Sequence, residues 1–129
     1  MRSLAREIVF QYVFSKLFNQ GDEGLFDVLS KELSKDDKIF AKSLLDAVTV
    51  NKTRFEGELK NLSENFRLER IFAADRCAIF IGMAELTVFK DTPKAVVIDE
   101  TVKLAAKFST ENSTDYVNGI LAEYAKNLQ

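Results

Sequence analysis

Histidine is absent from this 129-residue chain, and cysteine occurs only once, at Cys77. The lack of histidine excludes a histidine general base and every catalytic triad that depends on one. It also leaves a zinc site of the Cys/His type without its usual ligands, so we expect no metal ion and no cofactor. A single cysteine cannot form a disulfide within the chain, which fits a reducing compartment, and we expect the cytoplasm.

A surplus of positive charge is missing as well. The chain carries 18 lysines and arginines against 20 aspartates and glutamates, a net charge of -2. Domains that bind nucleic acid through charge alone are usually strongly basic, so this chain is not a generic nucleic-acid binder, although a small basic patch stays compatible with it. The apolar run Ile8–Phe14 contains Gln11 and lacks a small-residue cleavage site, so no secretory signal is predicted.

The apolar stretch Ile71–Phe89 predicts the element around which the chain folds. As a helix it would be apolar on nearly every side, and a helix without a polar face is buried. A membrane span is disfavoured by Asp75, Arg76 and Glu85, because charges inside a bilayer cost kilocalories each. Gly82 in the middle of the stretch predicts the close approach of a crossing helix. We therefore expect the central helix of a soluble all-helical domain.

Helical periodicity also dominates the rest of the chain. The pattern from Ser34 to Asp37 resembles a capping box that opens a long third helix. Asn51 interrupts the apolar stripe of that helix, and we interpret it as an asparagine bonded to a loop carbonyl. The only proline, Pro93, falls at a first helical turn, where a missing N–H is tolerated.

The complete prediction is an all-α fold, a single domain over residues 1–129 built as a compact bundle of about seven helices. No stretch predicts a convincing strand. Besides the central helix, the predicted segments cover residues 2–18, Leu25–Leu33, 34–62, a short turn near 68–70, Pro93–Phe108, and a last helix capped by Asn112 or Ser113.

The second half of the chain carries an ordered series of motifs. They are Asp75-Arg76, Ala84-Glu85-Leu86, Thr92-Pro93, Val97–Ala105 with Phe108, and Ser113 followed by Tyr116–Leu121. Ala5-Arg6-Glu7 and Gln11 extend the series into the first helix. Taken together, these motifs resemble the NusB family of bacterial transcription antitermination factors. The resemblance covers nearly the whole chain and is strongest from Arg70 to Leu121.

The resemblance implies two packed helical subdomains and a function without catalysis, so the chain is not expected to be an enzyme. Proteins of this family bind a short single-stranded boxA element at the start of nascent ribosomal RNA. They do so together with NusE, a protein of the small ribosomal subunit, in an RNA polymerase complex that resists termination. Whether the free protein forms a homodimer stays open.

The resemblance also implies roles for individual residues. Those expected to contact RNA are Arg2, Arg6, Phe14, Phe108, Asn112, Ser113, Tyr116 and Asn118. Asp75 and Arg76 are expected to face the NusE partner. Phe10 and Phe18 share a helical stripe with Phe14, and such stripes are usually core, so only Phe14 is assigned to the surface.

A second function fits the same fold. The net negative charge, and the interruption of the N-terminal arginines by Ser3 and Leu4, favour a protein-interaction module with little RNA affinity of its own. The neighbouring carboxylates Asp99 and Glu100 are interpreted as a solvated or capping pair, because acid–base catalysis by paired carboxylates needs a pocket and a raised pKa.

Overall fold

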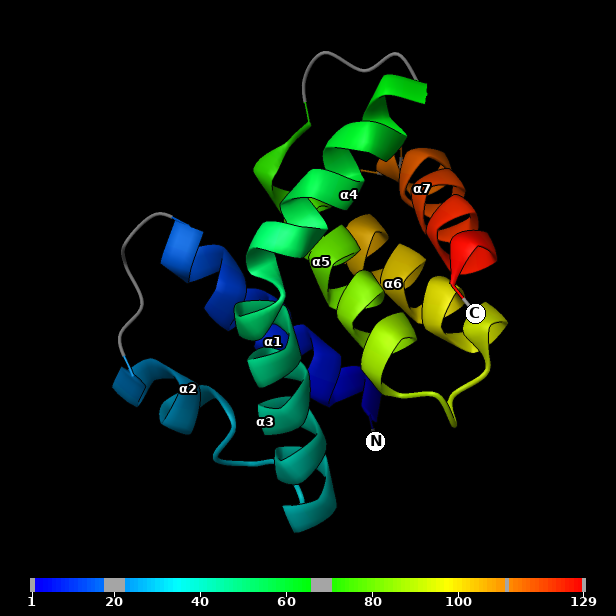
Figure 1. The fold of residues 1–129 in the computed structure, drawn as a ribbon. Coiled ribbons are helices and arrows are strands. Elements are labelled where there is room, and N and C mark those ends of the chain that lie inside the picture. Colours follow the sequence, from blue (N-terminus) through cyan, green and yellow to red (C-terminus); the bar gives the residue numbers. More distant parts are fainter. Residues whose placement is uncertain (1, 18–22, 66–70, 111, 129) are drawn as a thin grey trace.

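The computed structural model describes residues 2–17, 23–65, 71–110 and 112–128, drawn as coloured ribbon in Figure 1. These residues form seven α-helices joined by short connections. The helices are α1 (Arg2–Leu17), α2 (Glu23–Leu29), α3 (Lys35–Val50), α4 (Lys52–Asn65), α5 (Ala73–Val88), α6 (Lys94–Phe108) and α7 (Ser113–Asn127). The all-α prediction is confirmed.

Helix α5 is the centre of the bundle, as its predominantly apolar sequence predicts. An unbroken run from Cys77 to Leu86 is buried. The helix contacts α1 and α3 on one side and α4, α6 and α7 on the other, so it joins the two halves of the molecule (Figure 1). In the described part of the chain, none of the helices has the length and apolarity that a bilayer crossing requires.

Gly82 allows two helices to approach α5 closely. A Cβ atom at this position would lie 2.8 Å from Cδ1 of Leu121 on α7 and 2.9 Å from Oγ1 of Thr101 on α6. Both distances are shorter than real Cβ contacts, so a side chain does not fit without movement of its neighbours. The predicted close approach of a crossing helix is thus confirmed, and two helices make it.

The predicted long third helix is wrong, because it is two helices, α3 and α4, divided at Asn51. The amide Nδ2 of Asn51 donates to the carbonyl of Ala47 at 2.9 Å, and its own backbone N–H bonds to the same oxygen at 3.2 Å. The side chain therefore ends α3 by bonding within the helix, not to a loop carbonyl as we expected. Phe55 restarts the ladder by donating to the Asn51 carbonyl.

Other boundaries differ by a few residues. Helix α2 begins two residues earlier than predicted and ends at Leu29, with a turn up to Ser34. Ser34 then caps α3 as predicted, because its hydroxyl accepts from the backbone N–H of Asp37 at 3.2 Å. The short turn predicted near residues 68–70 and the position of Phe18 lie outside the described residues.

Candidate nucleic-acid interface

Arg2 is the exposed member of the predicted arginine pair. It lies in the first turn of α1, with its guanidinium carbon 4.5 Å from the centre of the Phe40 ring. Its Nη1 donates a long bond of 3.4 Å to Thr92 in the loop between α5 and α6. The contact with the ring holds the guanidinium against the protein, while the residue as a whole stays exposed and can meet a phosphate.

Arg6, one turn later, is buried and only 4 % exposed. Its Nε and Nη2 donate to the two carboxylate oxygens of Glu85 on α5, at 2.7 and 2.6 Å. Nη1 also lies 3.7 Å from Oε2 of Glu100 on α6. The structure therefore revises the expected role of Arg6. Its guanidinium joins α1, α5 and α6 and offers no free fork at the surface.

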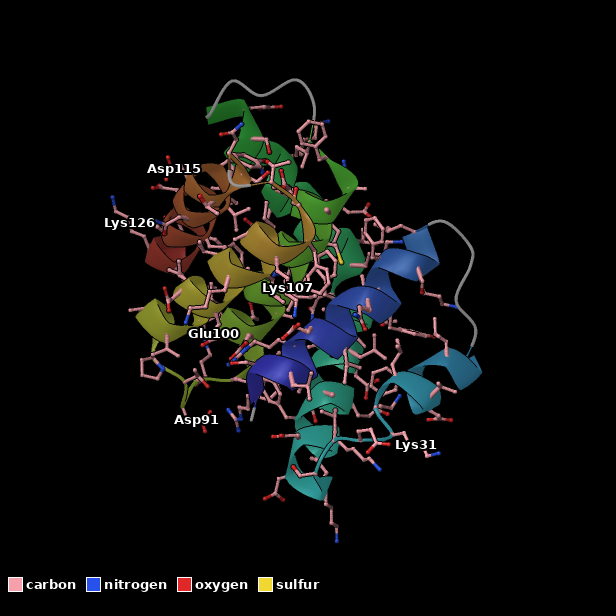
Figure 2. The ribbon with its side chains drawn as sticks, turned by 180° about the vertical axis from the view of Figure 1, so that it is seen from behind. Lys31, Asp91, Glu100, Lys107, Asp115 and Lys126 are labelled. Carbon is pink, nitrogen blue, oxygen red and sulfur yellow. The ribbon has the colours of Figure 1, made fainter. Side chains whose placement is uncertain are left out.

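Helices α1 and α6 lie side by side and run in the same direction, and we call the line between them the α1–α6 seam. Three side-chain contacts follow one another along it: Ser3 donates to Glu100 at 3.0 Å, Lys107 pairs with Glu7, and Phe10 stacks on Phe108. Figure 2 shows Glu100 and Lys107 along this line. The contacts are polar near the start of α1 and aromatic near the end of α6.

The aromatic end of the seam is a row of three stacked rings. Phe108 and Phe10 have centroids 4.5 Å apart, and Phe10 and Phe14 have centroids 5.7 Å apart, with nearly parallel planes in both pairs. The middle ring, Phe10, is buried, whereas the two outer rings are half-buried. Phe10 belongs to the core, as predicted, and it orients Phe14 and Phe108, whose exposed parts can contact a base.

The start of α7 is tied to the start of α5 through buried polar groups. The hydroxyl of Ser113 donates to Oδ2 of Asp75 at 2.9 Å, and both residues are buried. The other carboxylate oxygen of Asp75, Oδ1, is buried and has no hydrogen-bond partner among the described residues. Asn112 stands at the N-cap position of α7 and is exposed, and its side chain makes no capping bond. Ser113 therefore does not cap α7, and its hydroxyl fixes the loop before the helix instead.

Tyr116 lies one turn into α7 and is half-buried. Its hydroxyl is 3.2 Å from the hydroxyl of Ser63 on α4, and burial raises the pKa of Tyr116 above its usual value. Asn118, two residues further along the helix, is exposed. Tyr116 thus has an anchored hydroxyl and a ring that is partly open to a ligand.

The ten predicted residues therefore fall into two groups. Those with exposed or half-buried side chains are Arg2, Phe14, Arg76, Phe108, Asn112, Tyr116 and Asn118. Arg6, Asp75 and Ser113 are buried, so their side chains support the surface and do not form it. Sequence reasoning missed Lys107, whose exposed ammonium lies 5.6 Å from the centre of the Phe108 ring. Its place directly before Phe108 was the available signal.

The two neighbouring carboxylates Asp99 and Glu100 both have polar partners. Asp99 pairs with Lys103, and Glu100 bonds to Ser3 and approaches Arg6, so these carboxylates are already engaged in polar contacts. Within the described residues, no three acidic or cysteine side chains come together as a metal site.

Comparison with known proteins gives a consistent result over nearly the full length. The model of the NusB family matches residues 1–126. The transcription antitermination protein NusB of Methylacidiphilum infernorum is 33% identical over an alignment that covers 97% of this chain and 90% of that protein. The corresponding protein of Dictyoglomus thermophilum is 32% identical, with coverage of 98% and 85%.

Solved structures agree. T. maritima NusB superposes with a TM-score of 0.88 at 28% identity and covers 98% of this chain and 92% of that one. A crystal structure of the antitermination factors NusB and NusE in complex with double-stranded RNA contains a chain that superposes with a TM-score of 0.84 at 25% identity. That match covers 98% of this chain and 97% of the other.

Proposed function

Because this chain belongs to the NusB family of transcription antitermination factors, we propose that it binds a boxA-type single-stranded RNA together with NusE. The complex would act at the start of ribosomal RNA transcripts, within an RNA polymerase assembly that resists termination. The observation that carries the proposal is the aromatic end of the α1–α6 seam, where the half-buried rings of Phe14 and Phe108 flank Phe10. The exposed Arg2 lies at the other end of α1, where its guanidinium packs on the Phe40 ring of α3. The related crystal structure that holds NusB, NusE and RNA supports it.

In this proposal the exposed and half-buried residues contact different parts of the RNA. The Arg2 guanidinium contacts a phosphate, since its planar fork matches phosphate oxygens. The rings of Phe14, Phe108 and Tyr116 contact bases, because every base offers a face for stacking. Twelve residues of helix separate Arg2 from Phe14, about 18 Å, which corresponds to several nucleotides of extended strand.

The amide side chains and the buried residues complete the surface. Asn112 and Asn118 are exposed near the start of α7 and can bond to base edges, which carry the sequence information. Arg6, Asp75 and Ser113 hold α1, α5 and the loop before α7 in register. Their substitution would disturb RNA binding only through the positions of these elements.

A protein partner is part of the proposal because the surface is weakly charged. The chain has a net charge of -2, and the positive charge of Arg6 is paired with Glu85 inside the protein. A basic ribosomal protein beside the seam would extend the positive surface and raise the affinity for RNA. Arg76, half-buried at the start of α5, is the residue we assign to the NusE contact, with Asp75 positioning that end of the helix.

The test is the affinity for labelled boxA-like RNA, measured by fluorescence anisotropy with and without NusE. We expect NusE to tighten binding at least tenfold, about 1.4 kcal/mol. The same RNA in single-stranded and duplex form should be compared, with the single strand preferred. Equal dissociation constants with and without NusE would contradict the proposal. Sedimentation of the free protein shows whether it is a homodimer that must separate first.

A second function is favoured by the burial of Arg6. Only one of the two predicted arginines reaches the surface, so the chain has less charge for RNA than its sequence suggests. On this reading the protein joins the antitermination complex through protein contacts and has little RNA affinity of its own. It predicts normal binding to NusE, and RNA binding by the pair no tighter than by NusE alone.

A further inference from the structure

A groove lies between α1, α2 and α3, beside the face of α1 that carries the aromatic row. Helix α2 packs against α1, where the Phe26 ring meets the Tyr12 ring edge to face at 5.5 Å between centroids. It makes no such packing against α3, and an open cavity of about 830 Å³ remains between the two helices. Figure 1 shows α2 set apart from α3 at the edge of the molecule.

The groove and the proposed RNA surface use different faces of α1. Tyr12, Val13 and Lys16 line the groove, whereas Phe10 and Phe14 belong to the aromatic row. At 3.6 residues per turn, Tyr12 and Lys16 point about 200° away from Phe14 around the helix, whereas Val13 and Leu17, which also line the groove, lie about 100° and 60° from it. A molecule that lies against Tyr12 and Lys16 would leave the α1–α6 seam open.

The floor of the groove is apolar and its rim is basic. The floor includes Tyr12, Leu45 and Phe80, all of them buried residues. Among the described residues that line the groove, four are lysines and two are aspartates. The lysines are Lys16, Lys38, Lys42 and Lys52. This local surplus of positive charge occurs on a chain whose net charge is -2. Asp46 is paired with Lys42 at 3.2 Å, but both side chains are more than half exposed, so the pair is weak.

The lysines are spread along the groove rather than gathered at one end. Lys38 and Lys42 are one turn apart on α3, and Lys52 begins α4, so the line from first to last spans about 21 Å of helix. A ligand with one anionic headgroup needs positive charge at one end only. A row of separated cations matches a ligand with several negative charges along its length.

We propose that this groove binds an acidic amphipathic helix of a protein partner. Its apolar face would lie on the floor and its carboxylates would meet the lysines on the rim, as in other helix-in-groove complexes. The cavity volume lies within the usual range of ligand-binding pockets, about 300–1,000 Å³. RNA is the poorer fit, because stacking needs exposed ring faces, and Tyr12 and Phe80 are only 8 % and 2 % exposed.

The experiment selects peptides of about twelve residues, roughly three helical turns, from a randomised display library on the full chain. Selected peptides are then labelled, and their affinity is measured by anisotropy. We expect them to be acidic, with apolar residues at i, i+3 or i+4 spacing. The double variant Lys38→Glu/Lys42→Glu should weaken their binding at least about tenfold.

The matched control is Lys60→Glu/Lys126→Glu, which makes the same charge change at two exposed lysines outside the groove. It should change the affinity by less than about twofold. A selection that yields no acidic peptides, or only neutral and basic ones, overturns the proposal. So does an equal loss in both variants, since the effect would then be one of net charge.

The inference does not depend on RNA binding. Saturating peptide should leave boxA-like RNA bound, because Tyr12 and Lys16 in the groove point away from Phe14 and the α1–α6 seam. If Lys38→Glu/Lys42→Glu weakens RNA binding more than peptide binding, the groove is a nucleic-acid surface and the proposal is wrong. Melting temperatures of both variants, measured alongside, exclude loss of binding through unfolding.

Discussion

Arg6 and Glu85 form a two-pronged ion pair inside the protein, with N–O distances of 2.7 and 2.6 Å, although they are 79 residues apart in the chain. The carboxylate of Glu85 is 1 % exposed, so it depends on the Arg6 guanidinium for both of its hydrogen bonds. The pair fixes α1 against α5, and the proposed RNA surface is built on α1.

We predict that Arg6→Ala destabilises the protein by about 3–5 kcal/mol, because it leaves an uncompensated carboxylate in the interior. The double variant Arg6→Met/Glu85→Met should recover most of that loss, since it removes both charges and keeps the volume. Urea melts of the two variants decide it. Arg6→Ala with unchanged stability but weaker RNA binding would mean that Arg6 reaches the RNA directly.

Arg2 should behave in the opposite way. Its guanidinium is exposed, so Arg2→Ala should leave the melting temperature nearly unchanged. It should weaken RNA binding at low salt and flatten the log–log salt dependence by about 0.7, the value for one phosphate contact on a single strand. Arg54→Ala is the control, because Arg54 is also exposed but belongs to α4, which does not form the α1–α6 seam. The same effect from both variants would exclude a specific contact by Arg2.

The contrast between these two arginines shows where sequence reasoning stops. The central helix was predictable because a stretch that is apolar on every side has only one stable environment, the interior. The burial of Arg6 was not, since a lone arginine in a first helix is usually exposed, and its partner Glu85 lies far away in the sequence. The break at Asn51 was likewise hidden, because it depends on one side chain competing for the Ala47 carbonyl.

Gly82 offers a test of the close packing of α6 and α7 against α5. A glycine-to-alanine change in an open helix stabilises it by up to about 1 kcal/mol. At Gly82 the new Cβ would meet Thr101 and Leu121 below 3.0 Å, so we predict a loss of roughly 1–3 kcal/mol for Gly82→Ala, and more for Gly82→Leu. Gly57→Ala is the matched control, since nothing lies within 4 Å of its Cβ, and it should be neutral or stabilising. Chemical denaturation that ranks the two alanine variants equally would show that α6 and α7 do not crowd α5.

Two variants of Tyr116 test the role of its ring separately from the role of its hydroxyl. Tyr116→Phe removes the contact with Ser63 and should cost about 0.5–1.5 kcal/mol of stability, with RNA affinity unchanged. Tyr116→Ala removes the ring and should weaken RNA binding by about 1–3 kcal/mol without altering the salt slope, because stacking releases no counterions. Tyr124→Phe is the control, because Tyr124 is buried and its hydroxyl bonds to Thr87 at 2.7 Å. That variant should lose stability alone. If Tyr116→Ala and Tyr124→Phe reduce RNA affinity only in proportion to their loss of folded protein, the Tyr116 ring does not contact a base, and the start of α7 is a structural support for the seam.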